Sequence, residues 1–246
     1  MRILQALFRN SVPIFYAPQI ANGIYQLDET DSKHCLQVLR HQAGDNSVLA
    51  DGKGWFYEAR ISALRPKRCG FELIRQWRDP QAKSVDLHIA IAPPKNIARF
   101  EWFLEKATEI GISHITPLLT SRTERSELRL DRLEKIMVAA MKQTGKATLP
   151  RLYPATKFVP FIAQSTATQY PIRCIAHVAP HNPHLSTVYE RSKNALLLIG
   201  PEGDFTPDEV QTAAAAGFAP VSLGNSVLRV ETAGIFVCSL IQIANS

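Results

Sequence analysis

The sequence predicts an α/β protein with two domains, a small β-rich one followed by a larger one built on a mostly parallel sheet. The first 75 residues consist of short β-prone segments separated by tight turns. From residue 86 onward, apolar strand-like segments alternate with amphipathic helical ones, which is typical of a parallel sheet covered on both faces. The polar stretch Gln76–Ser84 indicates a linker. We therefore expect domains at residues 1–78 and 79–246, and 246 residues suffice for two.

The N-terminal domain is expected to be a compact β-barrel. Its strands are segments rich in β-branched and aromatic residues: Ile24–Leu27, Ser47–Asp51 and Trp55–Ser62. The run Asp51-Gly52-Lys53-Gly54 indicates a hairpin turn, because glycine tolerates a positive φ. One helix is expected among these strands, capped by Asp31-Ser32 and with an apolar face formed by Cys35, Leu36, Val38 and Leu39.

The C-terminal domain is expected to contain five strands and four helices. The strands are apolar segments: Asp86–Ala92, His114–Leu119, Ile172–Val178, Asn194–Gly200 and Pro220–Gly224. The helices have one apolar face each: Ala98–Gly111, Leu130–Thr144, Thr206–Ala216 and Thr232–Ala244. Gly111 is placed to end the first of them, and Pro207 lies in the first turn of the third.

Composition excludes several classes of protein. Hydrophobic residues make up 46% and charged residues 20%, as in ordinary globular proteins. No apolar run approaches the roughly 20 residues that span a bilayer, and the first ten residues lack the apolar stretch of a secretion signal. We therefore expect a cytoplasmic protein.

The cysteines and histidines give no metal-binding pattern. Cys35, Cys69, Cys174 and Cys238 are scattered without a CxxC pair, so we expect buried free thiols. His177, His181 and His184 are close in sequence. Prolines separate them, so they do not share one helical face, and we interpret them as part of a polar loop rather than a metal site.

The net charge of +6 favours a nucleic-acid partner without establishing one. Two regions are basic. The first holds candidates for phosphate contact in the β-rich domain: Arg40, Lys53, Arg60, Arg65, Lys67 and Arg68. The second is a stripe formed by Arg122, Arg125, Arg129 and Arg132. Acidic residues interleave with this stripe, so ion pairs on a helix surface are the competing explanation.

Two loops lie where an open parallel sheet binds ligands, beyond the carboxyl ends of strands. They are Gly200–Thr206 and Leu223–Thr232, and each connects a strand to a helix. A glycine-rich loop of this kind either binds an anion at the helix N-terminus or is an ordinary turn. Neither the Gly-Lys-Ser/Thr phosphate loop nor G-x-G-x-x-G is present, which argues against an ATPase or a dehydrogenase.

Taken together, three stretches resemble the SPOUT methyltransferases, and among these the RsmE family. They are the helix Glu101–Gly111, the loop Leu198–Gly203, and Ser222–Gly224 with Leu228-Arg229 and Glu231–Ala233. The N-terminal motifs Lys33-His34, Val38–Arg40, Gly44-Asp45 and Asp51-Gly52 are similar to that family's PUA-like barrel. The resemblance covers about residues 14–244.

The resemblance implies a SPOUT-type α/β domain with a trefoil knot behind a PUA-like barrel. It implies that a homodimer uses S-adenosylmethionine to methylate N3 of a uridine in 16S rRNA of the small ribosomal subunit, with no metal. It implies cofactor binding by two loops: Leu198, Ile199, Gly200, Pro201, Glu202, Gly203, Ser222, Leu223, Gly224, Leu228 and Thr232. RNA binding is expected from basic residues: Arg40, Lys53, Arg65, Lys67, Arg68, Arg122 and Arg125.

Arg229 and Glu231 are the candidate catalytic residues. Arg229 is suited to stabilise the oxygen that becomes negative as uracil N3 loses its proton. Its alternative role is a salt bridge to Glu231 or Glu202. Either glutamate could accept the proton or could cap the helix that follows its loop, and no histidine base is evident from the sequence.

The chain departs from the family pattern at several positions. Asp204 stands in place of a glycine, Asn225-Ser226 in place of Pro-Arg, and Val230 in place of a threonine. Lys142 replaces a glutamate and reverses its charge. Two alternatives stay open: a SPOUT methyltransferase acting on tRNA or on a ribose 2′-oxygen, and a non-catalytic RNA-binding ribosome assembly factor.

Overall fold

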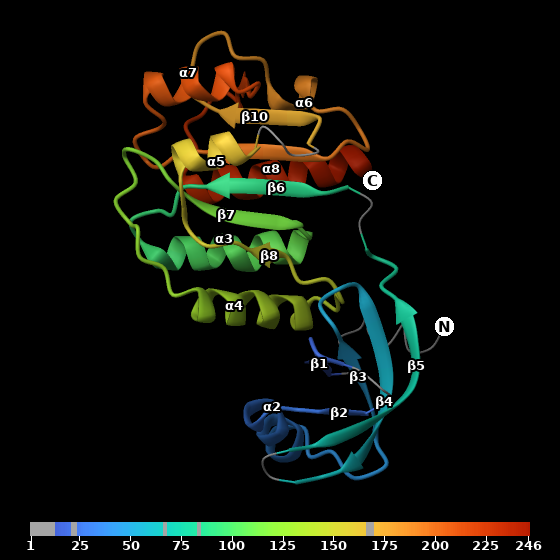
Figure 1. Cartoon of the computed structure of the whole chain (residues 1–246). Coiled ribbons are helices and arrows are strands. Elements are labelled where there is room, and N and C mark those ends of the chain that lie inside the picture. Colours follow the sequence, from blue (N-terminus) through green and yellow to red (C-terminus); the bar gives the residue numbers. More distant parts are fainter. Residues whose placement is uncertain (1–12, 21–23, 66–67, 83–84, 166–169) are drawn as a thin grey trace. The chain divides into compact units, whose positions relative to one another are not determined.

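The computed structural model describes residues 13–20, 24–65, 68–82, 85–165 and 170–246 (Figure 1). The chain forms two compact units. The first comprises Met1–Ala82 together with Val138–Leu149, and the second comprises Lys83–Met137 together with Pro150–Ser246.

The first unit contains a five-stranded sheet with the strand order β1-β3-β4-β5-β2. The strands are β1 (Ile14–Tyr16), β2 (Ile24–Gln26), β3 (Asn46–Ala50), β4 (Trp55–Ala63) and β5 (Gly70–Arg78). The pair β1–β3 is parallel and the others are antiparallel. The three strands predicted here are confirmed, but the closed barrel is not, because β1 and β2 are the ends of this strand order.

Two local predictions in this unit are wrong. Gln76–Arg78 is not linker but the end of β5, where Tyr57 pairs with Gln76 and Trp55 with Arg78. The segment looks polar because Gln76 and Arg78 are its exposed residues. Asp28, not Asp31-Ser32, caps the helix α2 (Glu29–Lys33): its carboxylate accepts a hydrogen bond from the Asp31 N–H at 2.8 Å. The helix continues into the π-helical turn His34–Val38.

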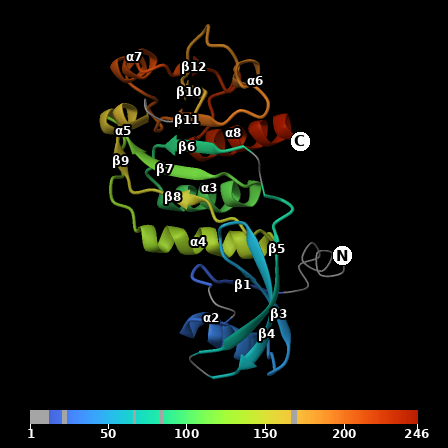
Figure 2. The same ribbon diagram turned by 45° about the vertical axis from the view of Figure 1, so that its right-hand side comes forward.

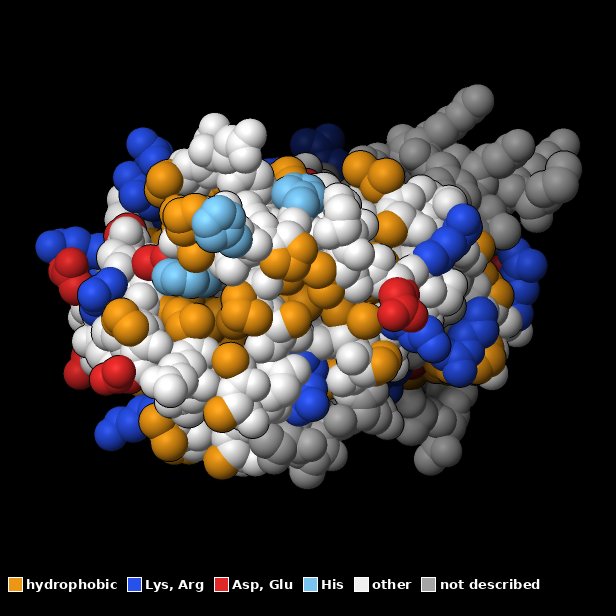
Figure 3. Space-filling view, turned by 90° about the horizontal axis from the view of Figure 1, so that it is seen from above, with side chains coloured by type: hydrophobic (Ala, Val, Ile, Leu, Met, Phe, Trp, Pro, Cys, Tyr) orange, Lys and Arg blue, Asp and Glu red, His pale blue; other side chains and the backbone are white. Residues whose placement is uncertain are grey.

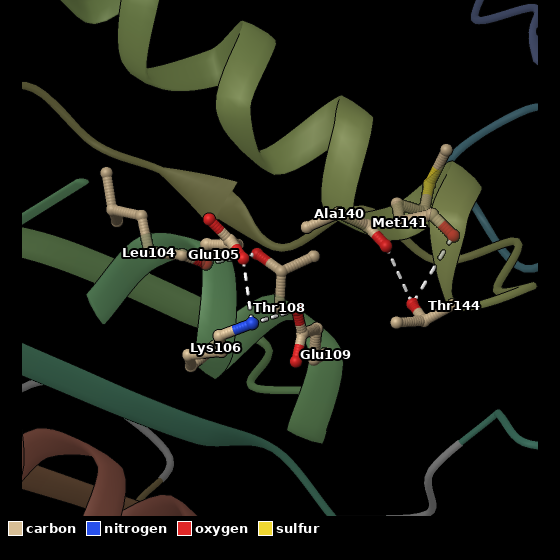
Figure 4. A network of polar contacts seen from close by, with 8 residues as sticks. All are labelled: Leu104, Glu105, Lys106, Thr108, Glu109, Ala140, Met141 and Thr144. Atoms are coloured by element: carbon tan, nitrogen blue, oxygen red, sulfur yellow. Dashed lines mark hydrogen bonds and ion pairs between the residues drawn. The ribbon is translucent and has the colours of Figure 1, made fainter. Parts of the chain in front are cut away.

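Val138–Leu149 completes the first unit although the sequence analysis assigned it to the second domain. Met141 and Ala147 pack with Ile14, Val48 and Phe56 in one apolar cluster. The segment contains the end of the helix α4 (Leu130–Gln143), where the Thr144 hydroxyl donates to the Ala140 carbonyl oxygen at 2.8 Å (Figure 4). This segment therefore packs with the first unit, although the residues before and after it in the sequence belong to the second.

The second unit is built on a parallel sheet with the order β12-β10-β11-β6-β7-β8, and β9 pairs with β7 (Figures 1 and 2). Its strands are β6 (Leu87–Ile91), β7 (His114–Leu119), β8 (Arg151–Leu152), β9 (Thr156–Lys157), β10 (Ile172–Ala176), β11 (Ala195–Ile199) and β12 (Ala219–Val221). Every pair is parallel, which confirms the predicted sheet. The strand β10 ends at Ala176, two residues earlier than expected, so His177 lies in a loop.

Helices cover both faces of this sheet. On one face lie α3 (Ile97–Ile110) and α8 (Val230–Asn245), which bring Phe103 and Gly234 against Ile91. On the other lie α5 (Phe158–Ser165) and α7 (Pro207–Ala215), which share a core with Leu196 and Leu198. The short α6 (Leu185–Val188) follows β10. The sequence predicted α3, α4, α7 and α8 but neither α5 nor α6.

The helix α3 shows why its sequence forms a helix at this place. Its predicted face is buried, with Phe100, Phe103, Leu104 and Ala107 in the core, and Gly111 ends it with a φ of 99°. On its outer side, the Lys106 ammonium lies 2.7 Å from both the Glu105 and the Glu109 carboxylate (Figure 4). An amphipathic helix of this kind gains most of its stability from the buried face.

All four cysteines are buried free thiols, as predicted. No helix among the described residues is long and apolar enough to cross a membrane.

Candidate active site

A cavity of about 610 Å³ lies in the second unit, at the carboxyl ends of three neighbouring strands. Residues 176–180, 199–202 and 222–230 line it, together with Asn182, Asp204 and Ala233. These segments follow β10, β11 and β12. Because the three strands are adjacent and parallel, their following loops meet at one edge of the sheet.

Backbone hydrogen bonds fix the first and third loops to each other. The His177 N–H donates to the Val221 carbonyl oxygen at 3.1 Å, and the Ser222 N–H donates to that of Pro183 at 2.9 Å. The Leu185 N–H in turn donates to Ser222 at 2.9 Å. Three backbone hydrogen bonds therefore attach the β10–α6 connection to the end of β12 and the loop that follows it.

The second loop turns sharply at Gly200. A side-chain carbon there would lie 3.1 Å from the Phe205 ring and 3.2 Å from its backbone nitrogen, so the position favours glycine. Thr206 and Glu209 then form a capping box that begins α7. Burial raises the pKa of the Glu209 carboxyl, but hydrogen bonds from Thr206 and Ser121 outweigh burial, and the pKa is lowered overall.

The third loop presents its residues to solvent and to the cavity. The Ser222 hydroxyl lies 3.1 Å from the Gly224 nitrogen and stabilises the turn, in which Gly224 has a φ of 122°. Val227 is 83% exposed beside it. Arg229 is exposed, lines the cavity, and forms no ion pair with any residue that the structure describes. Its guanidinium is therefore available to a ligand.

Comparison with known proteins identifies this architecture. Residues 81–242 match the family model described as an RNA methyltransferase domain. The ribosomal RNA small subunit methyltransferase E of Synechocystis sp. is 31% identical over 221 residues, which cover 87% of this chain and 71% of that protein. The chain belongs to the ribosomal RNA small subunit methyltransferase E family.

Solved structures agree with this assignment. A protein from Porphyromonas gingivalis described as a probable rRNA methyltransferase is 39% identical with a TM-score of 0.88, covering 95% of this chain and 98% of that one. Ribosomal RNA small subunit methyltransferase E from Neisseria gonorrhoeae, solved with S-adenosyl methionine bound, is 26% identical with a TM-score of 0.85 and the same coverage. The family resemblance noted in the sequence is therefore confirmed.

In this member of the methyltransferase E family, most of the predicted cofactor-binding residues line the cavity. They are Ile199, Gly200, Pro201, Glu202, Ser222, Leu223, Gly224 and Leu228. Leu198, Gly203 and Thr232 are not among the lining residues, and Leu198 is fully buried in the sheet core.

The two candidate catalytic residues are placed differently. Arg229 lines the cavity and Glu231 does not. The Glu231 carboxylate is nearly buried and lies 3.7 Å from the Arg99 guanidinium, so it pairs across two helices and not with Arg229, the alternative role considered for that arginine. Its other oxygen has no hydrogen-bond partner among the described residues.

The loop after β10 forms a wall of the cavity that contains no predicted site residue. His177 and Asp204 both line the cavity, and the Nδ1 atom of His177 lies 2.8 Å from a carboxylate oxygen of Asp204. The available signal was a histidine next to the last residue of the predicted strand Ile172–Val178. That signal became informative only once β10 was known to lie between β11 and β12.

The candidate RNA-binding residues belong to both units. In the first unit Arg40, Lys53, Arg65 and Arg68 are exposed, and Lys67 lies outside the described residues. In the second unit Arg122 donates to the Gly203 carbonyl oxygen, and Arg125 donates to that of Lys95 at 3.0 Å. These two arginines brace loops near the cavity. Among the described residues, no group of three or more His, Cys, Asp or Glu side chains could hold a metal ion.

Proposed function

We propose that this chain transfers a methyl group from S-adenosylmethionine to N3 of a uridine in 16S rRNA of the small ribosomal subunit. The observation that carries the proposal is the cavity formed by the loops after β10, β11 and β12. Relatives from Neisseria gonorrhoeae and Legionella pneumophila that share the fold over 95% of this chain were solved with this cofactor.

The residues present fit the cofactor. A cavity of about 610 Å³ is in the range that holds a drug-sized ligand. Ile199, Gly200, Leu223 and Leu228 line it, and backbone groups of such residues can bind adenine and ribose without a charged side chain. Leu198, Gly203 and Thr232 would support these loops from behind. When bound, the cofactor supplies a methyl group made electrophilic by a positively charged sulfur.

The protein's own contribution is orientation and charge. Methyl transfer requires the attacking nitrogen, the methyl carbon and the sulfur to lie in line, and fixed orientation can lower a barrier by roughly 7–11 kcal/mol. Arg229 is positioned at the cavity with a free guanidinium, which would stabilise the negative oxygen of the deprotonated uracil. Glu231 would act indirectly, by holding the start of α8 through Arg99.

RNA binding is assigned to the first unit as a PUA-like barrel and to the basic residues of both units. Because N3 lies on the Watson–Crick edge, the target uridine must leave its stack, at a cost of a few kcal/mol. Exposed Arg40, Lys53, Arg65 and Arg68 would supply phosphate contacts that offset this cost.

We also propose the trefoil knot, a homodimer and a cytoplasmic location for this chain. The helix α8 leaves an apolar stripe uncovered, with Phe236 and Leu240 half-buried and Ile243 74% exposed at helical spacing. Light scattering on the purified protein tests the dimer. A single-chain mass at micromolar concentration would contradict it.

The methylation itself is tested by incubating the protein and labelled S-adenosylmethionine with small ribosomal subunits, free 16S rRNA and tRNA. Nucleoside mass spectrometry should find 3-methyluridine in the rRNA. Label in tRNA or on a ribose would instead indicate another SPOUT activity. Absence of label everywhere, with no cofactor binding by calorimetry, would favour a non-catalytic assembly factor.

A further inference from the structure

Three polar contacts hold His177 at the cavity. Its backbone N–H donates to Val221 at 3.1 Å, and the Asn182 side chain donates to its carbonyl oxygen at 2.9 Å. Its ring nitrogen Nδ1 lies 2.8 Å from Oδ2 of Asp204. Figure 3 shows histidine side chains gathered among exposed hydrophobic ones on this end of the second unit. The imidazole is thus held in place rather than free on a loop.

The Asp204 carboxylate is itself built into the loop. Its Oδ2 accepts from the Val178 N–H at 3.1 Å, and its Oδ1 lies 2.7 Å from the Phe205 nitrogen. Asp204 has a φ of 60°, a left-handed conformation that aspartate and asparagine adopt more readily than most L-residues. These contacts aim one oxygen at His177.

This arrangement selects one protonation form of the ring. An ionised carboxylate only accepts hydrogen bonds, so Nδ1 of His177 carries the hydrogen in their contact. In the neutral ring, Nε2 then carries the lone pair and can accept a proton. The side chain is 24% exposed, and no described residue binds Nε2. The chain therefore places a base at the cavity.

The other titratable or charged side chains lining the cavity are less suited to accept a proton. They are Glu202, Asp204 and Arg229. A guanidinium cannot accept, and both Asp204 oxygens already do. Glu202 accepts from the Lys95 N–H at 3.2 Å and is largely in solvent. Arg122 adds a positive charge beside the same loop.

We propose that His177, positioned by Asp204, takes the proton from uracil N3 during methylation, an inference that rests on the proposed function. The N3–H bond breaks and its proton passes to Nε2. The electron pair left on nitrogen forms the bond to the methyl carbon, and the carbon–sulfur pair stays on sulfur. The Asp204 carboxylate offsets the positive charge of the imidazolium, and the proton then leaves to solvent.

Steady-state kinetics with small subunits or 16S rRNA test the proposal. His177→Ala should lower kcat about 10²-fold or more, as expected for loss of a general base, while the KM for S-adenosylmethionine changes by less than about threefold. The dependence of kcat on pH should differ between His177→Ala and the native protein. Imidazole added to the buffer should restore part of the lost rate of the variant. His181→Ala is the matched control, since His181 is exposed on the same loop and does not line the cavity.

A second readout needs no turnover. In ¹⁵N-histidine NMR spectra of the free protein, one ring should be the Nδ1–H form, and this signal should be absent from His177→Ala. Asp204→Asn should remove the preference for that form and lower kcat, because an amide cannot stabilise the imidazolium. Asparagine tolerates the positive φ of this position, so the backbone is retained.

Each outcome decides the question. A His177→Ala variant with near-native kcat, or one impaired only in KM for S-adenosylmethionine, overturns the role of His177 and leaves the proposed methylation intact. Finding the Nε2–H form of the His177 ring by NMR would also overturn this role. So would the rise of kcat with pH being lost in Glu202→Gln and not in His177→Ala. A native protein that binds the cofactor but produces no 3-methyluridine overturns the proposed function and this inference with it.

Discussion

The carboxylate of Asp79 accepts a hydrogen bond from the backbone N–H of Ala147 at 2.8 Å, joining residues 68 positions apart within the first unit. Asp79 is 5% exposed and follows directly after β5. Its other oxygen accepts from the Gln81 N–H at 2.8 Å. One acidic side chain thereby attaches the segment after α4 to the end of the five-stranded sheet.

Asp79→Ala should destabilise the first unit by about 2–4 kcal/mol, because it leaves the buried Ala147 N–H without a partner. Amide hydrogen exchange should show faster exchange at residues 144–149, and thermal unfolding should begin earlier. The exposed acidic residue Glu127 provides the control: Glu127→Ala should change neither. Unchanged protection of Ala147 would contradict the prediction.

Stability should fall in mild acid because of His88. Burial and the nearby His114 lower the pKa of His88 from 6.5 to about 3. Below pH 6.5 the unfolded chain therefore binds a proton that the native chain does not bind until about pH 3. The free energy of unfolding should decrease through this window, by up to about 1.4 kcal/mol per pH unit. Chemical denaturation at several pH values measures the slope.

His88→Phe should reduce this pH dependence while keeping the packing. The His88 ring contacts Tyr153 and Phe161 at centroid distances of 5.5 and 5.8 Å, so an aromatic replacement fits. The variant removes the His88 Nε2 atom that lies 2.8 Å from the Thr116 hydroxyl. This loss lowers the free energy of unfolding by an amount that does not vary with pH. His181→Ala should retain the native slope, since His181 is exposed. Equal slopes in native protein and His88→Phe would exclude His88 as the cause.

Gly234→Ala should lower stability although alanine is the better helix former. A methyl group at this position of α8 would overlap the Phe103 ring and lie 3.1 Å from the end of the Ile91 side chain. Overpacking of this kind costs about 1–3 kcal/mol, more than the helix-propensity gain of about 1 kcal/mol. In a Phe103→Leu background the same change should cost less, and strict additivity of the two changes would argue against this contact.

Arg229→Ala should lower kcat about 10²-fold or more, as for loss of a donor that stabilises the transition state. Cofactor affinity measured by calorimetry should stay close to native. Arg229→Lys should recover part of the rate, because lysine keeps the charge but loses the planar donor pair. A near-native rate for the alanine variant would remove Arg229 from the mechanism.

Local sequence patterns predicted much of the second unit. Asn96 and Thr206 cap helices that begin where the apolar periodicity begins, and Gly111 ends α3 as expected. The helix α5 was missed because Phe158–Ser165 is short and almost wholly apolar, with no charged face to reveal a helical period. The strand β5 was not predicted at all, because Glu72, Arg75, Gln76 and Arg78 are polar and exposed and hide its strand pattern.

The candidate site was predicted only in part, because not all of its loops carry a recognisable local sequence pattern. The glycine-containing loops carry a local signal, and the cavity contains most of their predicted residues. The β10–α6 loop carries only one weak signal, a histidine near the end of a predicted strand. Glu231 was a candidate because it lies in the stretch Glu231–Ala233 that resembles the family, with proton acceptor and helix cap as its possible roles. Its carboxylate instead pairs with Arg99 on a neighbouring helix.

The sequence by itself determined the alternation of strands and helices, the helix ends, the buried thiols and the family, because each depends on residues near one another in the chain. Only the tertiary structure decided that β10 lies between β11 and β12, that Ala147 packs with the first unit, and that His177 meets Asp204. Strand order and side-chain pairing are set by which apolar faces bury one another. Which faces become buried together depends on residues from the whole chain, so patterns of neighbouring residues do not predict it.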